Sequence, residues 1–279
     1  MKGNIPMERV AAVQMRPELL EVEKNLQSIL LSFEEAVTSG ARLVVFPECA
    51  LSGYDLSLNE AQVVAESIPG HLSERLSQAC KELDATIMVG ILERDDSGRI
   101  FNTALVTGPD GILGRYRKTH LPHLGIDRFL ASGEELLPPL KTPIGRVGTL
   151  ICYDLRFPEP CRALALMGAQ IVLISTAWPS AATLYPDFVA QTRAAENGVF
   201  LVAANRIGEE HGARYLGHSL IIGPDGEVLA QAGGEEETIL YADIDPSLSD
   251  QKRRVFLAGE YELDIFNDRR PKLYGEIVR

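Results

Sequence analysis

The stretch Arg146-Val-Gly-Thr-Leu-Ile-Cys-Tyr-Asp-Leu-Arg-Phe-Pro-Glu159 joins an expected strand to an expected helix through a cysteine. The apolar run 147–151 is typical of a buried strand, and an amphipathic segment, 159–167, follows the proline. Open α/β sheets place their chemistry at the carboxyl ends of strands, which is where Cys152 falls. Taken alone, a cysteine that closes an apolar run is more often a small core residue than a nucleophile. Catalysis becomes the better interpretation if the rest of the chain supplies a base and an oxyanion donor.

The composition is that of an ordinary folded protein, with 279 residues of which 46% are hydrophobic and 24% charged. The net charge of −12 and the pI near 5.0 argue against a nucleic acid or an anionic membrane as partner. The basic cluster Arg115-Tyr-Arg-Lys118 is too short to reverse this. No apolar run approaches the roughly 18 residues of a membrane span, and no signal peptide is recognisable. We expect a cytoplasmic protein.

The cysteines and histidines do not form a recognisable metal site. The four cysteines show no C-x-x-C pair and no zinc-ligand spacing, which favours reduced thiols. His120 and His123 are near enough in sequence to share a metal, but the intervening Leu121-Pro122 favours a loop and no carboxylate motif completes the set. We therefore expect no metal site.

The chain consists of two similar halves. The first has expected strands at 9–15, 41–46, 86–91 and 102–107, helical patterns at 23–39 and 73–83, and the turn Gly108-Pro-Asp-Gly111. The second repeats this order with strands at 146–152, 169–174, 199–204 and 218–222, a helix from near Pro186 to 197, and the turn Gly223-Pro-Asp-Gly226. In both turns proline occupies the second position and glycine the fourth, and this pattern suits a type I hairpin turn. The matched order indicates an internal duplication.

Strands that alternate with helices and end in a hairpin predict two mixed sheets, which bury their apolar faces by stacking with helices outside. We therefore expect an α/β fold, a four-layer α-β-β-α sandwich that forms a single domain over residues 1–279. The pattern weakens after about residue 247. Residues 247–279 are expected to form a C-terminal arm in which arginines surround Phe256 and Phe266. A partner subunit would cover this arm, and a polar tail that covers itself is the alternative.

Three expected strand ends carry the groups that a nucleophilic cysteine needs. Glu48 follows the strand 41–46, Lys118 follows the first hairpin, and Cys152 ends the strand 146–152. A thiol nucleophile requires a group that takes its proton and a cation or dipole that holds the oxyanion. Glu48 and Lys118 suit these two roles, and no histidine occupies an equivalent strand end. The presence of all three groups at expected strand ends favours the catalytic interpretation of Cys152.

Three segments in order resemble the signatures of the nitrilase superfamily, the carbon–nitrogen hydrolases. They are Leu43-Val-Val-Phe-Pro-Glu48 with Ser52-Gly-Tyr54, Gly114-Arg-Tyr-Arg-Lys-Thr-His-Leu121, and Gly148-Thr-Leu-Ile-Cys-Tyr-Asp154. Further matches are Arg162-Ala-Leu-Ala-Leu-Met-Gly-Ala169, Arg193-Ala-Ala-Glu-Asn197 and Ala204-Asn-Arg206. The resemblance implies an α-β-β-α sandwich that forms homodimers or larger homo-oligomers. It also implies that Glu48 is the base, Lys118 the oxyanion stabiliser and Cys152 the nucleophile, with the backbone N–H of Tyr153 sharing the oxyanion.

The chain departs from the family pattern after the lysine, where family members commonly carry a second glutamate. Residues 120–129 contain no glutamate, and Asp127 is the nearest carboxylate. Asp127 is therefore a candidate for positioning substrate or water. Tyr54 and Trp178 are candidates for the substrate pocket, with a core position as the alternative for the tryptophan.

Other residues near these motifs have structural interpretations. Cys49 follows Glu48 but points the opposite way on an extended chain, so we expect it in the core. Arg193 and Glu196 are three apart on a helix and predict an ion pair. Asp154 is expected to support the turn after the nucleophile.

The resemblance implies a cofactor-free thiol hydrolase of carbon–nitrogen bonds other than peptide bonds. Cys-Tyr-Asp resembles the amidase and carbamoylase branches, whereas nitrile-cleaving members more often have Trp-Glu after the cysteine. An aliphatic or N-carbamoyl amide, hydrolysed through a cysteine thioester with release of ammonia, is therefore favoured. The alternatives are a true nitrilase, a non-catalytic binding or assembly protein on the same scaffold, and a glutaminase subunit that feeds a separate synthetase.

Overall fold

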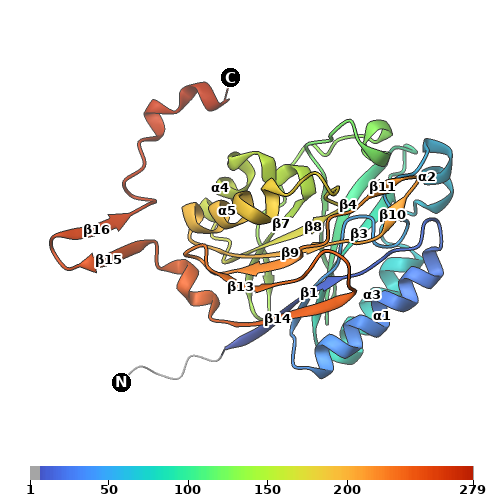
Figure 1. The fold of residues 1–279 in the computed structure, drawn as a ribbon, viewed down its shortest axis with the longest axis horizontal. Coiled ribbons are helices and arrows are strands. Elements are labelled where there is room, and N and C mark those ends of the chain that lie inside the picture. Colours follow the sequence, from blue (N-terminus) through green and yellow to red (C-terminus); the bar gives the residue numbers. More distant parts are fainter. Residues whose placement is uncertain (1–6, 279) are drawn as a thin grey trace.

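A computed structural model of the protein describes residues 7–278 and contains two six-stranded mixed sheets stacked between layers of helices (Figure 1). The helices α1 (Val22–Thr38) and α3 (His71–Leu83) cover one sheet, and α4 (Pro158–Leu166) and α5 (Ala190–Asn197) cover the other. The predicted four-layer α-β-β-α sandwich is confirmed. Among residues 7–278, no helix has the length and apolar character that crossing a membrane requires.

The first sheet has the order β14-β1-β2-β3-β4-β5. Its strands are β1 (Glu8–Gln14), β2 (Leu43–Val45), β3 (Thr86–Arg94), β4 (Ile100–Gly108), β5 (Gly111–Arg117) and β14 (Thr238–Ile244). Strands β1, β2 and β3 are parallel, and β4, β5 and β14 pair antiparallel with their neighbours. The short helix α2 (Leu58–Val64) lies in the connection between β2 and α3.

The second sheet has the order β13-β12-β9-β8-β7-β6. Its strands are β6 (Leu140–Thr142), β7 (Gly145–Ile151), β8 (Ile171–Thr176), β9 (Phe200–Asn205), β12 (Leu220–Ile222) and β13 (Val228–Gln231). Strands β7, β8 and β9 are parallel, and β12, β13 and β6 are antiparallel to their neighbours. This order repeats that of β1 to β5, as the duplicated sequence predicts.

The two Gly-Pro-Asp-Gly turns close equivalent hairpins, β4–β5 and β12–β13. Both hairpins have an irregular register close to the turn. The last glycine of each turn, Gly111 or Gly226, has a positive φ, +106° and +91°. A type I turn followed by a residue with left-handed backbone forms a bulge that matches the right-handed twist of the two strands. Glycine adopts this backbone without strain, which explains its place at the fourth position.

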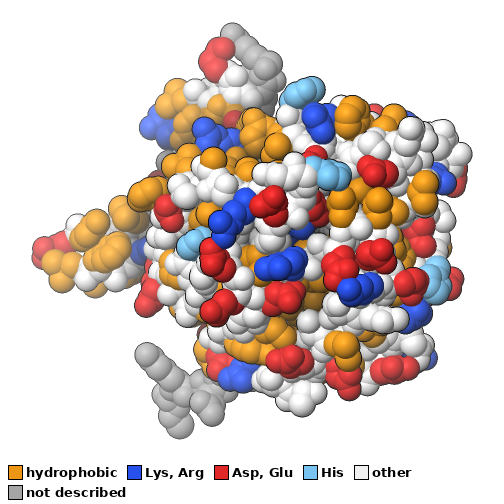
Figure 2. All heavy atoms as spheres, turned by 45° about the vertical axis from the view of Figure 1, so that its right-hand side comes forward, with side chains coloured by type: hydrophobic (Ala, Val, Ile, Leu, Met, Phe, Trp, Pro, Cys, Tyr) orange, Lys and Arg blue, Asp and Glu red, His pale blue; other side chains and the backbone are white. Residues whose placement is uncertain are grey.

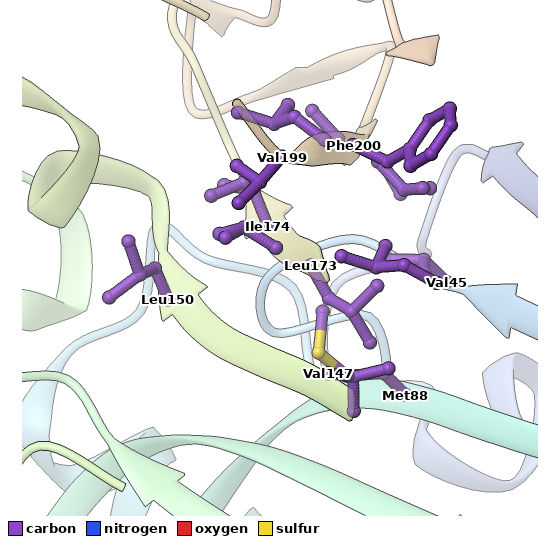
Figure 3. Packing of buried hydrophobic residues seen from close by; sticks show 14 of the residues in the cluster. Val45, Met88, Val147, Leu150, Leu173, Ile174, Val199 and Phe200 are labelled. Carbon is purple, nitrogen blue, oxygen red and sulfur yellow. The ribbon is translucent and has the colours of Figure 1, made fainter. Parts of the chain in front are cut away.

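Alternate residues of each strand enter two different parts of the core. Val45 of β2 and Met88 of β3 meet Val147 of β7 and Leu173 of β8 between the sheets (Figure 3). The neighbouring Val44 faces the other way and belongs to the core under α1 and α3. Because both faces of these strands are covered, their sequences are continuous apolar runs.

The predicted helix near Pro186 begins differently from the expectation. Residues Tyr185–Val189 form a wide π-helical turn, and the regular helix α5 starts only at Ala190. Such turns insert an extra residue per turn and are frequent at functional sites, a feature that helix periodicity cannot reveal. The turn brings Tyr185 against Trp178, with ring centroids 5.3 Å apart and nearly parallel rings.

The C-terminal arm leaves the body of the protein as the hairpin β15 (Arg253–Leu257) and β16 (Tyr261–Asp264) (Figure 1). Its apolar side chains are exposed and gather on the projecting hairpin (Figure 2). Phe256 stacks on Tyr261 within the hairpin. Phe266 turns back to the body, where Arg162 and Lys252 lie over its ring. The arm therefore is attached at its base and uncovered at its tip.

Candidate active site

The stacking of the sheets brings the three predicted catalytic residues to one edge. Glu48 follows β2, Lys118 directly follows β5, and Cys152 directly follows β7. Glu48 and Lys118 are fully buried, and Cys152 is 7% exposed. Ser175 donates a hydrogen bond from Oγ to the carbonyl oxygen of Phe46 (2.8 Å), which ties the two sheets together at this edge.

Lys118 lies between two carboxylates. Its Nζ is 2.6 Å from Glu48 Oε1 and 2.5 Å from Asp127 Oδ2. Burial by itself would lower the pKa of Lys118, but the negative charges of Glu48 and Asp127 outweigh this and hold its pKa well above the usual value. The lysine therefore stays a cation at a fully buried position, as an oxyanion partner must.

Asp127 reaches this cluster from the 3₁₀ turn η1 (Gly125–Phe129). Its Oδ2 accepts hydrogen bonds from Lys118 and from the hydroxyl of Tyr54, 2.8 Å away. Asp127 and Tyr54, which sequence reasoning treated as separate candidates, are therefore joined directly, and both are buried.

Asn102 is a member of the cluster that sequence reasoning did not identify. Its side-chain amide on β4 donates to Glu48 Oε1 (2.7 Å) and to Asp127 Oδ1 (2.9 Å). It therefore holds the two carboxylates at a fixed separation around the lysine. In the sequence it was only the first residue of a predicted strand; its complete burial in β4 shows that this polar side chain needs buried partners.

Glu48 keeps one carboxylate oxygen free. Lys118 and Asn102 both bind Oε1, whereas Oε2 is buried without a hydrogen-bond partner. Burial raises the pKa of Glu48, Asp127 raises it further, and Lys118 opposes the rise. A carboxylate with a raised pKa and an unused oxygen is suited to accept and return a proton.

The backbone at Cys152 is strained. Its φ is +44°, in the left-handed region that non-glycine residues rarely adopt, and it starts the 3₁₀ turn η2 (Cys152–Arg156). Strain of this kind is concentrated at functional sites. Burial raises the pKa of the thiol, and so does the charge of Glu48; Lys118 and the backbone N–H of Ala177 act in the opposite direction. The thiol is thus within the electrostatic reach of both predicted partners.

Two aromatic side chains, Trp178 and Tyr185, lie near the cysteine. Trp178 is buried in the same apolar cluster as Cys152 and stacks on Tyr185. Burial raises the pKa of Tyr185 to about 12, and the negative form of Cys152 contributes to this rise, which places this tyrosine near the thiol as well. Tyr153 packs edge-on against Phe157. Its N–H lies in the first turn of η2, where backbone donors have no partner within the helix.

Asp154 joins the nucleophile turn to the segment after Lys118. Its carboxylate accepts from the N–H of Ile151 (3.0 Å), the hydroxyl of Tyr116 (2.9 Å) and the N–H of His120 (3.1 Å). It also lies 2.7 Å from His120 Nδ1. The predicted support of the turn is confirmed, and the carboxylate links two elements rather than one.

Gly90 allows the Glu48 segment to approach β3. A Cβ at this position would lie 2.5 Å from the carbonyl oxygen of Pro47 and 2.7 Å from the Cα of Glu48. Any side chain there would push the segment away, so the position requires glycine.

The predicted core position of Cys49 and the predicted Arg193–Glu196 ion pair are confirmed, although the chain turns at Cys49 (φ +48°) instead of staying extended. Cys49 is fully buried in an apolar cluster, and Arg193 pairs with Glu196 at 3.0 Å. Within residues 7–278, no three His, Cys, Asp or Glu side chains are grouped as metal ligands would be.

Comparisons with known proteins identify the family of this chain. The sequence model of the carbon–nitrogen hydrolase family matches residues 9–254. A nitrilase of Pyrococcus abyssi is 37% identical over 96% of this chain and 99% of its own. The human omega-amidase NIT2 is 32% identical over 96% of both chains. An amidase of Nesterenkonia, solved with acrylamide added to its active-site cysteine, is 26% identical with a TM-score of 0.80, covering 97% of this chain and 99% of that one. The protein belongs to the carbon–nitrogen hydrolases of the nitrilase superfamily.

Proposed function

We propose that the protein hydrolyses a small amide through a thioester on Cys152 and releases ammonia. The observation that supports this most is the position of Lys118, a buried cation held between Glu48 and Asp127 beside a thiol on strained backbone. A scaffold that only bound partners would have no need for this costly arrangement of buried charges.

In the acylation step Glu48 takes the proton of Cys152, and the thiolate attacks the amide carbonyl carbon. The carbonyl oxygen becomes an oxyanion that Lys118 Nζ and the backbone N–H of Tyr153 stabilise. Glu48 then gives its proton to the amide nitrogen, the carbon–nitrogen bond breaks, and ammonia leaves. The product of this step is an acyl thioester on the cysteine.

In the deacylation step a water molecule takes the place of ammonia. Glu48 removes a proton from this water, whose oxygen attacks the thioester carbonyl, and the same oxyanion contacts are used again. The carbon–sulfur bond breaks, the carboxylic acid is released and the thiol regains its proton from Glu48. Asp127 positions Lys118 in both steps, which is the role that we assign to it in place of the family's second glutamate.

The substrate class is a small aliphatic or N-carbamoyl amide. Two observations support it: the thiol is nearly buried, and aromatic residues lie close to it, since Trp178 shares its apolar cluster and the charge of Cys152 affects the pKa of Tyr54 and Tyr185. The human omega-amidase and the Nesterenkonia amidase are relatives whose names fit this class. The relative named nitrilase in Pyrococcus abyssi makes a nitrile the second candidate.

An ammonia-release screen over aliphatic amides, N-carbamoyl compounds and nitriles tests the proposal. Wild-type protein is expected to release ammonia from an amide, and Cys152→Ala to release none while its circular dichroism spectrum is unchanged. Cys80→Ala, which removes another buried thiol on α3, is the matched control and should keep full activity. Turnover by Cys152→Ala would contradict the nucleophile, and turnover of nitriles alone would contradict the substrate class.

The C-terminal arm supports assembly into a homodimer or a larger homo-oligomer. Its hairpin exposes Val255, Phe256, Leu257 and Tyr261, each more than half exposed. Exposed apolar groups gathered on one projecting element are typical of an interaction surface. We assign residues 1–279 to one carbon–nitrogen hydrolase domain whose arm, residues 247–279, covers a second copy.

A further inference from the structure

A buried ion pair lies outside the catalytic cluster, directly after the end of β9. Arg206 is fully buried and pairs with Glu210 of the short strand β10 (Glu209–Glu210). Its guanidinium also lies 4.0 Å from the ring centroid of Tyr215. Taking two charges out of water is costly unless further hydrogen bonds satisfy them, so the contacts of this pair show what it holds in place.

Glu210 binds the loop that carries Tyr54. Its Oε2 accepts hydrogen bonds from two consecutive backbone N–H groups, those of Tyr54 (3.0 Å) and Asp55 (2.9 Å). The hydroxyl of Tyr215 donates to the same oxygen at 2.8 Å. Gly53, with φ +81°, lets the carboxylate come this close, because a Cβ there would lie 2.6 Å from Glu210 Oε1. The carboxylate therefore fixes the backbone of this loop.

The loop that contains Tyr54 in turn holds Asp127, which contacts Lys118. The hydroxyl of Tyr54 donates to Asp127 Oδ2, the oxygen that also lies 2.5 Å from Lys118 Nζ. The carbonyl oxygen of Tyr54 accepts from the N–H of Ile126, one residue before Asp127. Tyr54 thus holds Asp127 through both its side chain and its backbone, and Glu210 holds Tyr54.

We propose that Glu210, kept in place by Arg206, is a positioning residue for the hydrolysis. It sets the place of Tyr54, and through Tyr54 that of Asp127 and Lys118. This inference rests on the proposed amide hydrolysis. Because Glu210 acts on the oxyanion side of the site, its loss should lower kcat far more than it changes KM.

A double-mutant cycle with Glu210→Gln and Tyr54→Phe tests the inference, with ammonia release as the assay. Glu210→Gln is expected to lower kcat about tenfold or more, the effect of losing a charged hydrogen-bond acceptor. In the Tyr54→Phe background the same substitution should lower kcat by less than about threefold, because the effects of residues in one network are not additive. Glu209→Gln, which changes the exposed neighbour, is the matched control and should leave kcat unchanged.

Tyr215→Phe provides a milder variant that keeps the ion pair and removes one donor to Glu210. A folded Tyr215→Phe protein is expected to show a kcat lowered about two- to fivefold, in line with one lost hydrogen bond. Equal losses from Glu210→Gln in both backgrounds, or unchanged kcat in folded Glu210→Gln and Tyr215→Phe, would overturn the positioning role alone. Ammonia release that survives in Cys152→Ala would instead overturn the proposed function on which this role rests.

Discussion

Lys118 Nζ contacts two buried carboxylates, 2.5 Å from Asp127 Oδ2 and 2.6 Å from Glu48 Oε1. The carboxylate that departs from the family's sequence pattern is thus a full partner of the lysine. The turn η1 and the hydroxyl of Tyr54 bring this shorter side chain within contact distance.

Asp127→Asn should move the acid limb of the kcat/KM profile to lower pH. The negative charge of Asp127 raises the pKa of Glu48, which must be ionised to act as base. Removing that charge lowers this pKa, so activity persists to lower pH even though its maximum falls. Ammonia release measured from pH 4 to 8 checks this. An acid limb that stays in place or moves to higher pH would show that the two carboxylates are not coupled.

Asn102→Ala should lower kcat by about tenfold to a hundredfold, because Glu48 and Asp127 each lose a buried hydrogen-bond donor. Steady-state kinetics measures the effect, and thermal unfolding shows whether the fold is retained. Wild-type kcat in a folded Asn102→Ala protein would refute the role of this bridge.

Asp154→Ala should lower the free energy of unfolding by about 3 kcal/mol, since it removes a buried carboxylate that accepts hydrogen bonds from Ile151, Tyr116 and His120. Urea unfolding measures this value. Asp96→Ala, at an exposed turn position, is the control and is expected to change stability by less than about 0.5 kcal/mol. Equal stabilities of the two variants would be inconsistent with this link.

Phe256→Glu should shift the assembly to a smaller species, because it places a charge on the exposed arm. Leu31→Glu on α1 is the control: Leu31 is 66% exposed, against 58% for Phe256, and lies on the body rather than on the arm. Sedimentation equilibrium distinguishes the outcomes. A wild-type protein that is already monomeric, or an assembly that Phe256→Glu leaves intact, would argue against the arm as an interface.

The sheets and the catalytic strand ends could be predicted because both depend on local patterns. Continuous apolar runs identified the parallel strands, and the repeated Gly-Pro-Asp-Gly turns identified the duplication. The strands β14 and β6 were not predicted, because they lie at sheet edges where partial burial gives no clear apolar pattern.

The contacts around the lysine could not be predicted in full, because they depend on how separate elements pack. Asn102 was visible only as the first residue of a strand, and its two acceptors lie 54 and 25 residues away in sequence. Nothing in the sequence indicated a role for Glu210, since a buried glutamate cannot be told from an exposed one by sequence alone. Lys118, Glu48 and Asp127 were all candidates from the sequence, but only the structure shows that both carboxylates contact the lysine.

The most direct test of the account is to detect the acyl thioester on Cys152. Wild-type protein is mixed with a small amide that is hydrolysed, quenched in acid within the first turnover, and analysed by mass spectrometry after digestion. The predicted result is a peptide containing Cys152 that carries the acyl group, formed together with one equivalent of ammonia, and absent from Cys152→Ala. Hydrolysis with no acyl group on Cys152, or with the group on another residue, would contradict the account.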